Sequence, residues 1–174
     1  MNVGIIDLLK RTMGQVIQSH TDVKVPSIPK KYGTHGRLEI QELSISVPVY
    51  DHHGGDKQQI VDDENSAVFM DWGTQQCIAD HNHQNNFSNL NRVRVGKTIA
   101  ILDLQTKKNV YRCSMSQVGH IRLSDSGNRL FDSNWEPVYP QNAGGLCIYT
   151  CIKRVSPDTI DVRLTYWRPV NVEQ

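Results

Sequence analysis

Long hydrophobic runs are absent from this chain of 174 residues. The apolar stretch near the N-terminus, residues 3–9, is interrupted by Asp7 and followed by Lys10 and Arg11. Such a stretch is too short and too charged for a secretory signal or a membrane span. We therefore expect no membrane span here, either because the native protein lacks an anchor or because this is a truncated form of an anchored one.

An excess of one charge sign is also missing. The chain has 19 lysines and arginines against 18 acidic residues, which gives a net charge of +1. Aromatic residues make up only 7% of the chain, and they do not alternate with a basic stripe as in proteins that bind single-stranded nucleic acid. We therefore expect neither nucleic acid nor an anionic membrane surface as a partner. The apolar fraction of 38% suits one well-packed globular domain of this length.

The cysteines lack the C-x-x-C spacing that zinc ribbons and thioredoxin-like redox sites require. Cys147 and Cys151 lie on one predicted strand, about 13 Å apart if it is extended, which is too far for a disulfide. We interpret Cys77, Cys113 and Cys147 as small buried hydrophobic residues. Cys151 differs, because it ends the predicted strand and faces a loop rich in polar residues.

The organisation of the chain changes after its first thirty or so residues. Apolar residues recur near the helical period over residues 3–18, which predicts an amphipathic helix. Pro26 and Pro29 then mark a linker. We therefore divide the chain into an N-terminal helix and linker over residues 1–24 and a domain over residues 25–174.

The domain has the pattern of an all-β protein. Strand-like segments are predicted over residues 38–49, 67–70, 76–79, 97–104, 110–118, 146–151 and 160–167. The segments 97–104 and 110–118 are expected to form a hairpin. A long, mostly irregular connection is predicted between residues 118 and 146, and loops of that length usually bind or cover something. Seven or eight short strands with few helices indicate a closed barrel or a sandwich.

Three side chains on or beside these strands can together perform acyl transfer. Cys151 would be the nucleophile, His81 a general acid and base, and Arg163 a cation that stabilises developing negative charge. His83 competes with His81 but is more simply a solvated loop residue. Arg168 is the second choice for the arginine and Arg154 the third.

We expect neither a zinc site nor a calcium site. His81, His83 and Cys151 could ligate zinc, but no fourth ligand stands out in the sequence. The acidic run over residues 62–64 could bind calcium, but three neighbouring acids are usually a solvated loop.

The ordered motifs resemble those of the sortase family. Residues 146–151, LCIYTC, are similar to the sortase signature Thr-Leu-x-Thr-Cys, with Cys147 at the first threonine. Residues 78–82, IADHN, followed by FSNL at 87–90, resemble the family's histidine motif, with Asp80 in place of the usual glycine. Arg163 lies where sortases carry their arginine. The resemblance covers roughly residues 33–168.

This resemblance implies a fold, a reaction and a set of partners. The fold would be an all-β, closed eight-stranded barrel with an N-terminal helix and short helical turns. Cys151 would cleave a sorting-motif peptide bond through an acyl-thioester and pass the acyl group to an amine, either a cell-wall peptide or a pilin lysine. Thr150, Asn82 and Trp135 are the expected substrate-binding residues. No cofactor is implied. The expected location is the outer face of the cell membrane, and a truncated or a cytoplasmic form remains the alternative because this chain has no signal or anchor.

Two alternatives remain open. One is a hydrolytic cysteine peptidase on the same fold, which would have no dedicated amine acceptor. The other is a degenerate sortase-like module that binds a peptide or a partner without turnover; Asp80 before the histidine and the missing anchor favour it.

Overall fold

The computed structural model describes residues 34–50, 57–62, 66–72, 75–83, 86–104, 107–125, 128–138 and 145–170. The helix predicted over residues 3–18 lies outside the described residues, as do the whole of the 1–24 segment and the first part of the 25–174 domain. No helix within the described residues is both long and apolar enough to span a membrane.

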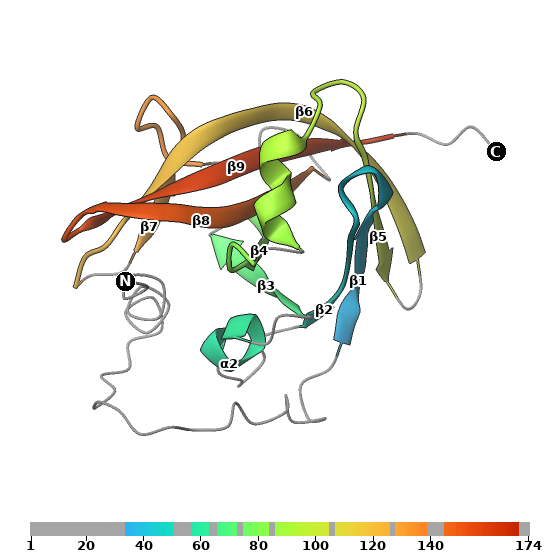
Figure 1. Cartoon of the computed structure of the whole chain (residues 1–174), viewed down its shortest axis with the longest axis horizontal. Coiled ribbons are helices and arrows are strands. Elements are labelled where there is room, and N and C mark those ends of the chain that lie inside the picture. The colour runs from blue at the N-terminus through green and yellow to red at the C-terminus, as the bar shows by residue number, and fades with distance from the viewer. Residues whose placement is uncertain are drawn as a thin grey trace.

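Strands dominate the described part of the chain, with one short α-helix and two short 3₁₀-helices (Figure 1). In chain order the elements are β1 (Thr34–Ile40), η1 (Gln41–Leu43), β2 (Ile45–Tyr50), α2 (Lys57–Asp62), β3 (Ala67–Trp72), β4 (Gln75–Asp80), η2 (Phe87–Arg92), β5 (Ile99–Leu104), β6 (Lys107–Arg122), β7 (Arg129–Phe131), β8 (Leu146–Ser156) and β9 (Thr159–Pro169).

Eight of the strands close into a barrel. The hydrogen-bonded order runs β5-β1-β2-β3-β4-β8-β9-β6, and a further pairing of β5 with β6 closes the ring. Strand β7 pairs with β6 outside this ring. The pairs β2–β3 and β4–β8 are parallel and the others antiparallel. The predicted closed eight-stranded β-barrel with short helical turns is confirmed, and the sandwich is excluded.

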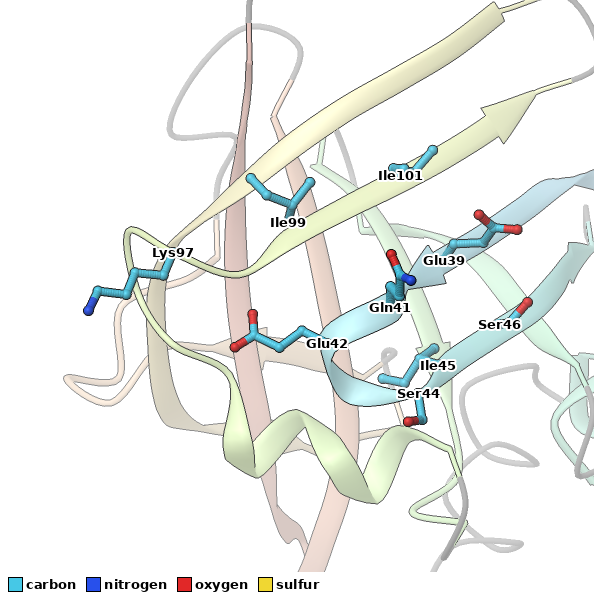
Figure 2. Close-up of a pocket in the computed structure, with 9 residues that line it drawn as sticks. All are labelled: Glu39, Gln41, Glu42, Ser44, Ile45, Ser46, Lys97, Ile99 and Ile101. Carbon is cyan, nitrogen blue, oxygen red and sulfur yellow. The ribbon is translucent and has the colours of Figure 1, made fainter.

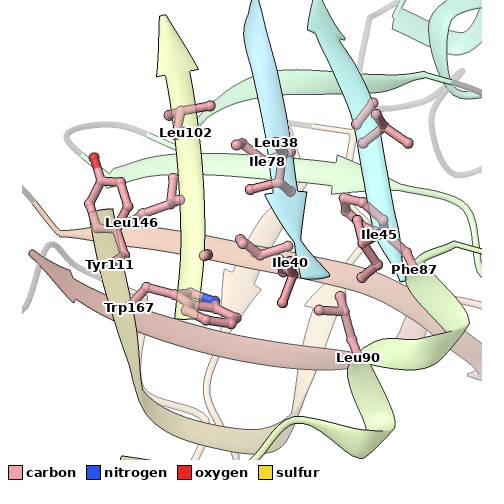
Figure 3. Close-up of a cluster of buried hydrophobic side chains, with 14 of the residues drawn as sticks. Leu38, Ile40, Ile45, Ile78, Phe87, Leu90, Leu102, Tyr111, Leu146 and Trp167 are labelled. Atoms are coloured by element: carbon pink, nitrogen blue, oxygen red, sulfur yellow. The ribbon is translucent and has the colours of Figure 1, made fainter. Parts of the chain in front are cut away.

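The barrel interior is filled by side chains from all eight of its strands and from the 3₁₀-helices (Figure 3). Large members that are almost fully buried include Leu38, Ile40, Ile78, Phe87, Leu90 and Trp167. Those on strands alternate with residues that face outward, because successive side chains on a strand point to opposite faces, whereas Phe87 and Leu90 come from η2. Strand β1 approaches β5 so closely at Gly36 that a Cβ there would collide with the carbonyl oxygen of Asp103.

A second apolar cluster covers the outer face of one side of the barrel. It takes side chains from β3, β4, β6, β8 and β9, and it is covered by Ile60 and Val61 of α2 and by Leu130 and Val138 in and after β7. Cys151 belongs to this cluster. The outer face is therefore a packed layer, and any site built around Cys151 lies at the edge of this layer.

The strand predictions hold better for position than for length. The hairpin of β5 and β6 is confirmed, but β6 continues to Arg122 and β7 lies inside the segment predicted to be irregular. Strand β8 does not end at Cys151 but runs on to Ser156. Cys77, Cys113 and Cys147 are buried as expected.

Candidate active site

Cys151 on β8 and His81, the residue directly after β4, occupy matching positions in the register of these neighbouring strands. Strand β8 runs parallel to β4, and Thr150 is the register partner of Asp80. The next residues along the two strands are Cys151 and His81. Neighbouring strands are about 4.8 Å apart, so the thiol and the imidazole are carried at the same end of one strand pair. The register thus puts Cys151 and His81, two of the three residues predicted to act, at the same end of the pair β4–β8.

The thiol of Cys151 is buried in apolar surroundings. Only 6% of the residue is exposed, and its side chain lies in the outer cluster with Tyr149 and Val162. This burial raises the pKa of the Cys151 thiol to about 12, because an apolar environment disfavours the thiolate. The prediction that Cys151 faces a loop rich in polar residues is therefore wrong. The thiol of the peptide-free protein is therefore almost entirely protonated at neutral pH.

A β-bulge follows Cys151 immediately. Cys151 pairs with Val162 on β9, but the next paired residue on β8 is Lys153, opposite Asp161. Ile152 is therefore the extra residue of the bulge. Bulges are common beside active sites, where they change the direction in which the following side chains point.

His81 is held by helix α2. Its Nε2 lies 3.0 Å from Asp62 Oδ1 and 3.3 Å from Gln58 Nε2. The side chain of His81 is 12% exposed and that of Asp62 is 32% exposed. Asp62 was predicted to be part of a solvated acidic loop, whereas the structure pairs it with the candidate catalytic histidine.

The carboxylate of Asp80, at the position where the family motif has glycine, is fully buried. Its Oδ1 accepts a hydrogen bond of 2.6 Å from the backbone N–H of His81, and its Oδ2 accepts one of 2.9 Å from Asn86 Nδ2. The aspartate therefore fixes the backbone at His81 and links it to the turn that begins η2.

His83 is more than a solvated loop residue. Its Nε2 lies 3.1 Å from the carbonyl oxygen of Val61 and 3.6 Å from Asp80 Oδ1. Its ring also meets that of His81 edge-on, with 5.5 Å between centroids. His83 thus connects α2 to the end of β4.

Arg163 does not face Cys151. It pairs with Thr150, and its neighbours Val162 and Leu164 belong to the outer cluster that contains the cysteine. Because successive residues of a strand alternate between faces, the side chain of Arg163 projects from the opposite face of the sheet. The register of β8 and β9 therefore puts Arg163 and Cys151 on opposite faces of the sheet.

Arg154, the third choice in the sequence, lies on the face of Cys151. It pairs with Ile160, which belongs to the same outer cluster as the cysteine. On a regular strand Arg154, three residues after Cys151, would lie on the opposite face from it. The extra residue of the bulge, Ile152, restores Arg154 to the same face as Cys151. The guanidinium is exposed and donates a hydrogen bond of 2.9 Å to the carbonyl oxygen of Pro157. Arg168 is exposed far along β9, paired with Arg112 on β6.

The three predicted substrate-binding residues do not form one surface. Thr150 is buried, and its hydroxyl donates a 2.9 Å hydrogen bond to the carbonyl oxygen of Asp80, so it ties β8 to β4. Asn82 is exposed beside His81. Trp135 stacks on His120 at a centroid distance of 4.3 Å. Because the neighbours of His120 on β6, Gly119 and Ile121, pair with outer-cluster residues, His120 and Trp135 lie on the face opposite Cys151.

A separate groove of about 700 Å³ lies over β1, β2 and β5 (Figure 2). Glu39, Glu42 and Lys97 line it together with Ile99 and Ile101 on β5. None of these residues belongs to the region around Cys151 and His81. Among the described residues, no group of three or more histidine, cysteine, aspartate or glutamate side chains is placed to hold a metal ion.

The residues that the sequence analysis missed are Gln58 and Asp62. They are four positions apart on α2, so they share one helix face, while Ile60 and Val61 point into the outer cluster. This i, i+4 polar pair around an apolar pair was a usable signal for a short amphipathic helix. Its contact with His81, 19 residues beyond Asp62, had no signal in the sequence.

No protein-family model matches the sequence, and no curated protein matches it. Solved structures do match. Sortase C1 from Streptococcus suis superposes with a TM-score of 0.56 at 11% identity, over 99% of this chain and 98% of that one. A pilus-related sortase C of group B Streptococcus gives 0.56 at 12% identity, over 91% and 76% of the two chains.

A third match, sortase E1 from Streptomyces coelicolor with a tripeptide in its active site, gives a TM-score of 0.54 at 15% identity, over 79% of this chain and 88% of that one. At such identities the shared property is the arrangement of the strands. This chain therefore has the sortase fold, a closed eight-stranded β-barrel, with Cys151 on strand β8 and His81 directly after the neighbouring strand β4.

Proposed function

We propose that this protein is a sortase-like cysteine transpeptidase with Cys151 as its nucleophile. The observation that carries the proposal is the placement of Cys151 and His81 at matching positions of the parallel pair β4–β8 in a sortase-type barrel. A thiol and an imidazole at one end of a strand pair are the two groups that acyl transfer to and from sulfur requires.

The reaction proceeds in two steps that balance in protons. Cys151 loses its proton to His81 and its sulfur attacks the carbonyl carbon of a sorting-motif peptide bond. The C–N bond breaks, and His81 returns the proton to the departing amine, which leaves an acyl-thioester on Cys151. An incoming amine then attacks the thioester and gives a proton to His81, and the thiolate of Cys151 leaves and is reprotonated.

Arg154 is the arginine that we assign to the developing oxyanion or the substrate backbone. The bulge at Ile152 turns it to the face of Cys151, and its guanidinium is exposed and always charged. A hydrogen-bond donor of this kind contributes about 10²- to 10³-fold to kcat. Arg163, on the opposite face, has no such role in this proposal.

A matched pair of arginine variants tests this assignment. We expect Arg154→Ala to lower kcat/KM for acylation by about 10²- to 10³-fold, because a donor to the oxyanion is lost. Arg163→Ala is the control and is expected to change it less than about tenfold. The reverse order of the two effects would show that the arginine is assigned to the wrong face.

The proposed partners are a sorting-motif peptide and an amine acceptor. A tripeptide occupies the active site of the Streptomyces coelicolor neighbour, which supports a peptide substrate here. The pilus-related neighbour supports a pilin lysine as one candidate acceptor, beside a cell-wall peptide. Both acceptors place the protein on the outer face of the cell membrane, which is part of the proposal.

Intact mass spectrometry with a library of sorting-motif peptides, with and without oligoglycine, tests the reaction. An acyl adduct on the wild-type protein that is missing in Cys151→Ala, and that disappears with oligoglycine, would support transpeptidation. An adduct released at the same rate without the amine would indicate a hydrolytic peptidase. No adduct across the library, from folded and reduced protein, would contradict the proposal.

A second candidate function is a peptide-binding module without turnover. The observation that favours it is the apolar character of the β9 positions beside the thiol: Ile160, Val162 and Leu164 share the face of Cys151, and burial raises the pKa of its thiol to about 12. Such a module would bind the peptide equally well as wild type and as Cys151→Ala, with no adduct on either. Isothermal titration with both proteins distinguishes it from the enzyme.

A further inference from the structure

The imidazole of His81 meets a small polar cluster on helix α2. Asp62 Oδ1 and Gln58 Nε2 lie 3.0 Å and 3.3 Å from the same ring nitrogen, Nε2. Gln58 also donates a hydrogen bond to Asp62 Oδ1. The carboxylate oxygen therefore sits between an amide donor and the ring.

The contact between Asp62 and His81 determines where the ring proton is. An ionised carboxylate oxygen and an unprotonated imidazole nitrogen are both acceptors, so a 3.0 Å contact between them requires a proton on the nitrogen. The contact favours hydrogen on Nε2 of His81, donated to Asp62; the Gln58 amide, also a donor, then directs its hydrogen to Asp62 Oδ1 and not to the ring. The other nitrogen, Nδ1, is the one left for proton transfer. Within the described part of the chain, it has no hydrogen-bond partner.

Helix α2 is fixed firmly enough to hold this contact. Ile60 and Val61 are 0% and 1% exposed and pack in the outer cluster that contains Cys151. The carbonyl of Ile60 accepts a hydrogen bond from the Ser66 hydroxyl, and that of Val61 lies 3.1 Å from His83 Nε2. The helix is thus tied to the same sheet face and to the same loop as the candidate catalytic pair.

The position of Asp62 within α2 supports a role beyond the helix itself. It is the last residue of the helix, where the partial negative charge of the backbone carbonyls disfavours an acidic side chain. The contact with His81 offsets that cost.

We propose that Asp62 is the positioning residue of His81. It holds the imidazole in one orientation with hydrogen on Nε2, and Gln58 holds the carboxylate in place. Nδ1 then takes and returns the proton in the acyl transfer at Cys151. The role of Nδ1 rests on the proposed function, whereas the tautomer rests only on the contacts of α2.

The tautomer is measured in protein that cannot react. Long-range ¹H–¹⁵N correlation spectra of Cys151→Ala, with the imidazole neutral, should show His81 mainly with hydrogen on Nε2. In Cys151→Ala/Asp62→Asn, the amide can donate to Nε2, so the Nδ1–H form should rise several-fold. Asp62→Ala is a second variant with the same expected direction, and neither change should unfold the protein, since Asp62 is the last residue of its helix and its side chain is only partly buried.

A matched control exists elsewhere in the chain. Asp161 Oδ1 lies 2.9 Å from His120 Nδ1, and the two side chains are 16% and 17% exposed. In Cys151→Ala/Asp161→Asn the His120 signals should move, and the His81 tautomer should stay as it was. An unchanged His81 tautomer in both Asp62 variants would overturn the proposal.

The rate of acylation in Asp62 variants distinguishes the positioning role of Asp62 from the proposed transpeptidase function. With Cys151 present, Asp62→Asn should lower kcat/KM for acylation by about 10- to 100-fold, as loss of a residue that orients a functional histidine does elsewhere. Asp62→Glu, which keeps the carboxylate, should restore part of the loss. If the wild-type protein forms no adduct while the tautomer responds as expected, the proposed function fails and the positioning contact stands. If adducts form equally fast in wild type and Asp62→Asn, the positioning role fails and the function stands.

Discussion

The pH dependence of Cys151 alkylation gives the most direct test of the site as the structure presents it. The perturbation is a change of pH on the peptide-free protein in the presence of a small alkylating reagent such as iodoacetamide. Only the thiolate reacts, so the rate follows the ionised fraction of the thiol. Burial raises the pKa of Cys151 from 9.0 to about 12, which makes that fraction very small.

The expected magnitude follows from the two pKa values. At pH 8 a thiol of pKa 9.0 is about one-tenth ionised, whereas one of pKa about 12 is ionised to about one part in 10⁴. Cys151 should therefore react roughly 10³-fold more slowly in the folded protein than in the protein unfolded in urea. Its rate should rise about tenfold per pH unit from pH 8 to pH 10 without levelling off.

Peptide mapping by mass spectrometry measures each cysteine separately, with Cys151→Ala as the blank. The slope against pH is the informative quantity, because steric shielding alone lowers the rate without changing where it levels off. A plateau below pH 10, or a rate at pH 8 equal to that of the unfolded protein, would refute the argument. Either result would mean that a neighbouring group stabilises the thiolate and outweighs burial.

The same burial has a consequence for stability. The folded state keeps the Cys151 proton above the pKa of the unfolded thiol, so folding is penalised as the pH rises from about 9 towards about 12. The penalty grows by about 1.4 kcal/mol per pH unit. Urea unfolding of wild type and Cys151→Ala should therefore diverge above pH 9, with the variant losing less stability. Parallel curves would contradict the raised pKa.

Two further predictions concern the framework of the site. Asp80→Ala removes the buried acceptor of the His81 backbone N–H and of the Asn86 amide, and should lower the free energy of unfolding by about 3 kcal/mol. The control is Asp103→Ala, on the exposed face of β5, which should change the free energy of unfolding by less than about 0.5 kcal/mol. Gly36→Ala places a Cβ against the carbonyl of Asp103 and should lower the free energy of unfolding in urea by about 1–3 kcal/mol. Amide hydrogen exchange along the paired strands β1 and β5 should increase. Unchanged exchange there would show that the barrel does not depend on this close approach.

The order and type of the strands could be predicted from the sequence, because alternation and turn residues are local signals. The hairpin of β5 and β6 and the strand around Cys151 are examples. Strand ends were predicted less well. Strands β6 and β8 run on through polar residues such as His120 and Lys153, which a hydrophobic pattern does not mark as strand but which pair with β9.

The candidate pair of Cys151 and His81 could also be found in the sequence, through motifs that are contiguous in the chain. The partner of the histidine could not. Asp62 reaches His81 only because α2 packs its apolar side, Ile60 and Val61, on the outer face of the barrel. That contact depends on tertiary packing, and no local pattern specifies it.

The sequence by itself determined an all-β domain with a thiol and an imidazole on two of its strands, because residue order and period are sufficient for that. Only the tertiary structure decided which arginine faces the thiol. Arg163 is the first choice along the chain and Arg154 the third, but the register of β8 with β9 puts Arg163 on the face opposite Cys151, and one extra residue at Ile152 puts Arg154 on the same face as Cys151. A shift of one residue reverses every side chain that follows it on a strand, and only the pairing with the neighbouring strand shows that the shift has occurred.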